Sequence, residues 1–117
     1  MKIRPEQREP FREELMARYV EQTAEHLRGR CPKQTDKMND EELRDHVRAG
    51  IAQAKRYEIT DANDTRRFLE YWTRYGQQFG HSPESRWAQM YLGDKNLNGT
   101  QKMDRIDDHY VFVVRGA

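Results

Sequence analysis

Apolar residues recur at helical spacing along most of this chain. From Phe11 to Leu27 they follow one another every four residues, with charged residues between them. Apolar positions three or four residues apart lie on one face of an α-helix. The pattern therefore predicts a long first helix, with Pro10 in its first turn and an end near Gly29, before Pro32.

A second helix is predicted after the polar connector formed by residues 32–39. Asn39 followed by Glu42 is a capping-box pair at a helix start, and apolar positions continue from Leu43 to Tyr57. Gly50 lies in the middle of this helix, where glycine costs about 1 kcal/mol relative to alanine. We interpret it as a point where another helix approaches closely.

The third predicted helix begins after Thr60, which we take as its small polar cap, and ends at Gly76 or Gly80. Its apolar positions between Phe68 and Phe79 are mostly aromatic. This segment is therefore expected to form the aromatic centre of the molecule.

A short fourth helix is predicted from Ser82, Pro83 and Glu84, a compact helix-start sequence with proline at the first helical position. Trp87, Met90 and Tyr91 would form its inward face, and Gly93 would close it.

The C-terminal region combines two patterns. Residues 103–113 carry apolar side chains at helical spacing, which predicts a fifth helix from near Thr100 to about Tyr110. The segment HYVFVV (109–114) has high strand propensity. Residues 109–117 therefore remain open between helix, strand and disorder.

Together these elements predict an all-α protein, a single compact bundle of four to five helices in one domain over residues 1–117. The predicted core comprises Phe11, Leu15, Tyr19, Val47, Ile51, Phe68, Trp72, Trp87 and Met103.

Charge and composition exclude several classes of function. The formal net charge is +1, so no strong field attracts nucleic acid or anionic lipid. The longest apolar run, Tyr110–Val114, is far shorter than a membrane span. The start MKIRPEQREP has no apolar stretch, so we expect no secretory signal and a cytoplasmic protein.

The sequence predicts no catalytic, cofactor-binding or metal-binding residues. Residues 94–99 fit the first half of a calcium loop, but Arg105 stands where the bidentate glutamate belongs. The four histidines have no metal-ligand spacing. Cys31 is interpreted as a small filler after a helix end. A small enzyme that uses His26, His46 or a carboxylate pair remains a less favoured alternative.

The chain has 15 arginines and 6 lysines, and arginine is favoured in protein interfaces. The aromatic, arginine-rich stretch from 66 to 91 is therefore the expected contact surface. The candidate partner-binding residues are Arg66, Arg67, Tyr71, Arg74 and Tyr91. Arg67, Tyr71 and Arg74 are spaced to share one helix face. The alternative is that the arginines only shield the aromatic cluster from water, in which case the first helix or the C-terminal tail would be the binding surface.

The chain resembles a family of small bacterial proteins encoded beside type VI secretion genes for spike and PAAR tip proteins, chaperones and toxins. The resemblance is carried by IRPEQ (3–7), EHLRGRCP (25–32), LRDHVRAGIAQAKRYEIT (43–60), RWAQMYLGD (86–94) and NLNGTQKMDRI (96–106). This chain has Glu58 where the family usually has glycine.

The resemblance implies a non-enzymatic accessory, an adaptor or co-chaperone in effector handling. Its partner would be an effector toxin, the toxin's chaperone or a spike or tip protein. The alternative is an immunity protein that binds and blocks a cognate toxin.

Overall fold

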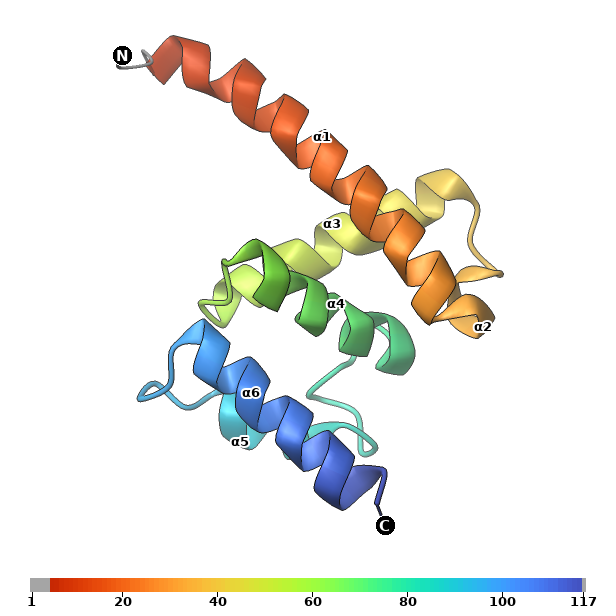
Figure 1. Ribbon diagram of the computed structural model, residues 1–117, viewed down its shortest axis with the longest axis vertical. Helices are drawn as coiled ribbons and strands as arrows, with labels where there is room; N and C mark the ends of the chain where they lie inside the picture. Colours follow the sequence, from red (N-terminus) through yellow and green to blue (C-terminus); the bar gives the residue numbers. More distant parts are fainter. Residues whose placement is uncertain (1–4, 117) are drawn as a thin grey trace. The chain divides into compact units, whose positions relative to one another are not determined.

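The computed structural model describes the backbone of residues 5–116 and the side chains of residues 12–116. Residues 5–116 contain helices and no strand, which confirms the predicted all-α class (Figure 1). The chain divides into two compact units at Arg48 and Ala49, within helix α3 (Asp40–Arg56), and the units are described in turn. The single domain expected over residues 1–117 stays a prediction.

The first unit begins with helix α1 (Pro5–Arg30), which starts earlier than the sequence pattern predicts. Pro5, rather than Pro10, therefore occupies its first turn, where a missing N–H is harmless. After Cys31, the residues predicted as a polar connector begin with a one-turn helix, α2 (Pro32–Thr35).

The guanidinium of Arg28 holds the connection between α2 and α3 in place. It donates hydrogen bonds to the carbonyl oxygens of Thr35 and Met38, both at 3.1 Å, and to Asp40 Oδ1 at 2.8 Å. The predicted capping box at the start of α3 is confirmed. Asn39 and Glu42 each accept the other's backbone N–H, at 2.8 and 3.0 Å.

Two of the predicted core positions in α1, Leu15 and Tyr19, are wrong. Leu15 is 45% exposed and Tyr19 is half-buried, and the side chain of Phe11 lies outside the described residues. The reason is length. A helix of 26 residues extends roughly 39 Å, further than the short elements of its unit can cover. Among the side chains of α1 that the structure describes, Val20, Thr23, Ala24 and Leu27 are buried.

Helix α4 (Ala62–Tyr75) is the centre of the second unit. Its N-cap is Asp61 rather than the predicted Thr60, and Gly76 ends it with a φ of 83°. The interpretation of Gly50 is confirmed, because a Cβ at this position would overlap with the side chains of Leu69 and Trp72.

The predicted fourth helix is replaced by a 3₁₀ turn, η1 (Arg86–Ala88), and a one-turn helix, α5 (Gln89–Leu92). The Ser82 hydroxyl is hydrogen-bonded to the Ser85 hydroxyl at 2.7 Å, and Ser85 Oγ also accepts the Gly80 N–H. The serine pair thus stabilises a turn instead of starting a helix. Met90, predicted to face inward, is 60% exposed.

Helix α6 (Gly99–His109) packs along α4 (Figure 1). Asn98 and Gln101 form a capping box at its start, which confirms the predicted fifth helix. The chain then continues as a π-helical turn, η2 (Tyr110–Val114), closed by a 2.7 Å hydrogen bond from Arg115 N–H to Tyr110 O. The tail left open between three states is therefore helical through Val114.

Four predicted core residues, Val47, Phe68, Trp72 and Met103, are buried. Ile51 and Trp87 are half-buried, in contrast to the prediction. Trp87 has one face against His109, as described below, and is not enclosed. Other large buried side chains of the second unit are Ile59, Leu69, Tyr71, Phe79, Leu92 and Ile106.

Candidate protein-binding surface

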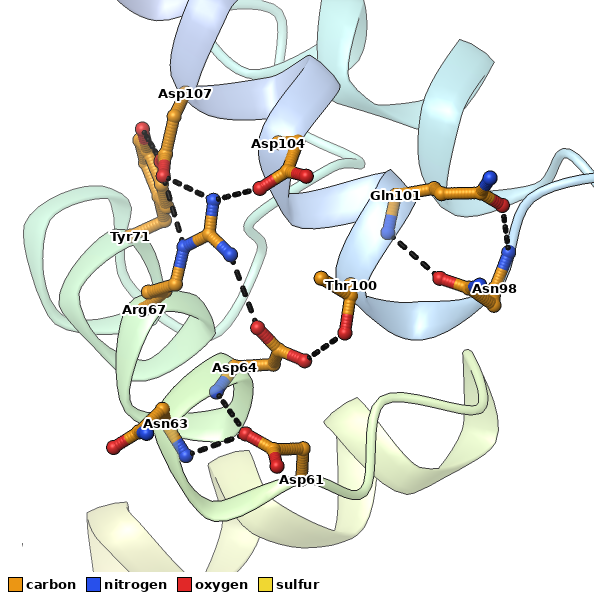
Figure 2. Close-up of polar contacts among 10 residues, drawn as sticks. All are labelled: Asp61, Asn63, Asp64, Arg67, Tyr71, Asn98, Thr100, Gln101, Asp104 and Asp107. Atoms are coloured by element: carbon orange, nitrogen blue, oxygen red, sulfur yellow. Dashed lines mark hydrogen bonds and ion pairs between the residues drawn. The ribbon is translucent and has the colours of Figure 1, made fainter.

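Arg67 on α4 contacts three carboxylates, two on α6 and one on its own helix (Figure 2). Its Nη2 donates to Asp104 Oδ1 at 2.8 Å and to Asp107 Oδ2 at 2.7 Å, and its Nη1 donates to Asp64 Oδ1 at 3.0 Å. Its Nε adds a second bond to Asp107. Burial alone would lower the pKa of Arg67, but the hydrogen bonds that it donates to Asp104 and Asp107 outweigh this effect and raise the pKa. The guanidinium is thus a fixed cation between the two helices.

Tyr71 extends this network, because its hydroxyl donates to Asp107 Oδ1 at 2.7 Å (Figure 2). Burial first, and then the hydrogen bond and charge of Asp107, raise the pKa of Tyr71. The phenol therefore stays protonated and remains a donor. At the other end of the network, the Thr100 hydroxyl donates to Asp64.

Arg74, one turn further along α4, has a different environment. Its Cζ lies 4.9 Å from the ring centroid of Tyr110 and 5.7 Å from that of Tyr71. These distances place the cation over two aromatic faces. None of the ion pairs formed by the described residues includes Arg74. The contact with the rings holds the guanidinium in place, and its N–H donors have no carboxylate partner among the described side chains.

A row of rings continues from Tyr110 across the surface. Tyr110 packs against Trp87 with centroids 6.5 Å apart, and Trp87 stacks on His109 at 4.8 Å with the planes 5° apart. His109 Nδ1 and the Tyr91 hydroxyl are hydrogen-bonded at 3.0 Å. The row therefore connects α5 to the end of α6.

The helix ends in four exposed apolar residues, Val111–Val114, which we call the apolar end. Phe112 is 76% exposed, and Val111, Val113 and Val114 are 46, 52 and 36% exposed. Four consecutive helical residues point in nearly all directions around the axis, and a helix that is apolar all round is normally buried. Exposed apolar clusters of this kind mark interaction surfaces.

The five predicted partner-binding residues occupy different environments. Arg67 and Tyr71 meet at Asp107, and Arg74 contacts Tyr71 and Tyr110. Tyr91 joins the row of rings through His109.

Arg66 makes none of these contacts. It is half-buried, and its Nε has no hydrogen-bond partner among the described residues.

Sequence reasoning missed the roles of Asp107, His109 and Tyr110. The signal that could have found the apolar end was the run YVFVV itself, which contains no charge. The high strand propensity of this run favours a strand, whereas the structure has an exposed helix end.

The loop that resembles half of a calcium site uses its oxygens locally. Asp94 Oδ1 accepts the Asn96 N–H at 2.9 Å, and Asn98 caps α6. Among residues with described side chains, no group of three His, Cys, Asp or Glu residues is placed to hold a metal ion.

No helix in the described part of the chain has the length and apolarity needed to cross a membrane.

Comparison with family models, with curated proteins and with solved structures gives no match to this chain.

Proposed function

We propose that this chain is a non-enzymatic protein-binding accessory that acts as an adaptor or co-chaperone. The observation that carries the proposal is the apolar end, Val111–Val114, which stands exposed beside the row of rings. A helix end that is apolar on all sides is covered when it inserts into a groove of another protein. Phe112 is its largest and most exposed side chain and is the expected anchor.

The resemblance in sequence supplies the biological context. We propose that the accessory acts in the cytoplasm on type VI secretion effectors. Its partner is an effector toxin, the toxin's chaperone or a spike or tip protein. Proteins of this kind need a surface that recognises one partner and releases it, and a small apolar anchor within a polar surface fits that need.

The test is affinity capture from the native host, with bound proteins identified by mass spectrometry. The wild-type chain is compared with Phe112→Ser and with the control Met90→Ser, which removes a similarly exposed apolar side chain outside the apolar end. We expect the wild type and the Met90 variant to capture the same secretion-related protein, and Phe112→Ser to lose it. Capture that is independent of Phe112, or absent altogether, would contradict the proposal.

An immunity protein could use the same anchor to block a toxin, and a deletion experiment separates the two functions. Loss of an accessory should reduce effector delivery to competitor cells and leave the producing cells healthy. Loss of an immunity protein should poison the producing cells and leave delivery intact. We expect the first result.

A further inference from the structure

Arg74 is a fixed cation next to the apolar end. Its guanidinium lies 4.9 Å from the ring centroid of Tyr110, and Tyr110 directly precedes Val111. Arg67, about two turns earlier on the same helix, satisfies its donors with three carboxylates. The ion pairs of the described residues leave Arg74 out. The N–H donors of Arg74 are therefore available to a group from outside.

From this geometry we infer that the partner's groove carries a carboxylate, from Asp or Glu, that pairs with Arg74 when the apolar end is inside. The inference rests on the proposed function and names the chemistry of its partner. A guanidinium already held over aromatic rings loses little conformational freedom when it binds, and its planar fork matches the two oxygens of a carboxylate. Arg115, which is exposed and directly follows Val114, adds a second cation next to the apolar end in the sequence.

The charges near the apolar end argue against two other binding partners, a second copy of this chain and an anionic membrane. A second copy of this chain would bring the same surface against itself, and the unpaired Arg74 side chains would face like charge. An anionic membrane would repel Asp104 and Asp108, which are exposed on the same helix. A protein groove with an apolar floor and an acidic rim matches both the apolar end and Arg74.

The occupant can be identified by photo-cross-linking in the native host from Phe112→p-benzoylphenylalanine. We expect cross-links to a different protein, within a segment that contains Asp or Glu close to apolar residues. Cross-links to a second copy of the chain, to phospholipid or to a segment without a carboxylate would overturn the inference, and so would the absence of cross-links.

Variants at position 74 then test the ion pair with the purified, cross-linked partner. Arg74→Gln should weaken binding about tenfold and flatten its salt dependence, because the charge-assisted hydrogen bonds are lost. Arg74→Lys should fall between Gln and the wild type. Arg105→Gln, which removes an exposed charge from α6, should bind as the wild type does. Arg74→Glu should abolish binding, and a carboxylate-to-lysine change in the partner should restore it.

These outcomes separate the inference from the function on which it rests. If capture requires Phe112 but Arg74→Gln binds as tightly as the wild type, the partner carboxylate is refuted and the proposed function stands. If no protein is captured, both are refuted. Circular dichroism and thermal melting of each variant establish that lost binding does not reflect lost folding.

Discussion

The ion network around Arg67 allows the effect of removing its guanidinium to be estimated. Arg67→Ala leaves the carboxylate of Asp64, whose side chain is 8% exposed, without its cation. It also leaves Asp104 and Asp107 as neighbouring negative charges on α6. Removing one partner of a fully buried ion pair costs about 3–5 kcal/mol, whereas exposed pairs contribute about 0–1 kcal/mol.

The side chains of this network are neither fully buried nor fully exposed, so the cost should lie between these two values. The Arg67 side chain is 28% exposed, and Asp107 and Asp104 are 38 and 59% exposed, so water screens two of the three contacts. We therefore expect Arg67→Ala to lower the free energy of unfolding by about 2–3 kcal/mol. For a domain of this size, that loss corresponds to a melting temperature roughly 10 °C lower.

Urea denaturation and thermal melting, both followed by circular dichroism, measure this loss. Arg105→Ala is the matched control, because it removes an exposed arginine of α6 that takes part in none of the described ion pairs. The control should change stability by less than about 0.5 kcal/mol. If Arg67→Ala is as stable as the control, solvent screening dominates and the network does not hold α4 to α6.

Four further substitutions test the packing, backbone and titration of the chain by the same denaturation measurements. Trp72→Ala should cost about 3–5 kcal/mol, because Trp72 is buried; a loss below 1 kcal/mol would contradict the packing. Gly50→Ala should destabilise by about 1–3 kcal/mol, since its Cβ would overlap with Leu69. Glu58→Gly should stabilise by roughly 0.5–1 kcal/mol, because Glu58 has a φ of 63°, where glycine is unstrained; a lower melting temperature would refute this. Burial lowers the pKa of His46 from its usual 6.5, so the unfolded chain binds the proton first and stability falls as the pH drops below about 6.5. His46→Gln should flatten that decline, and an unchanged slope would exclude His46 as its source.

The structural role of Arg67 makes it unsuitable for testing the binding surface. Because Arg67 and Arg74 are spaced to share one helix face, the sequence suggests a test in which both are replaced by alanine. That test expects weaker partner binding and an unchanged melting temperature. Because Arg67 holds α4 to α6, that double variant would lose stability along with any binding. Arg74 alone is therefore the informative position.

Features set by neighbouring residues could be predicted from the sequence. The capping box of Asn39 and Glu42 depends on residues three positions apart, and it is present. The close approach at Gly50 followed from the energetic cost of glycine within a helix. The left-handed φ of Glu58 gives a physical reason for the glycine usual there in the resembling family. In each case the signal lies in the type of one residue or in residues three positions apart, even though Gly50 marks an approach by the distant residues Leu69 and Trp72.

Features that depend on distant residues could not be predicted in this way. Leu15 and Met90 lie at correct helical spacing, but spacing gives the face of a helix and not what covers it. Asp107 pairs with Arg67 across 40 positions, which no local pattern records.

Arg67 and Arg74 differ in whether their charges are paired. Both lie on α4 next to aromatic rings, yet only Arg67 meets carboxylates. The apolar end departs from the rule that apolar helical surface is buried, and it begins at the residue after Tyr110, the ring that Arg74 covers. An arginine outside the described ion pairs and a run of four exposed apolar residues, placed side by side, have the composition of a binding surface. Stability alone would favour a carboxylate near Arg74 and polar residues at 111–114, as the same helices show at Arg67.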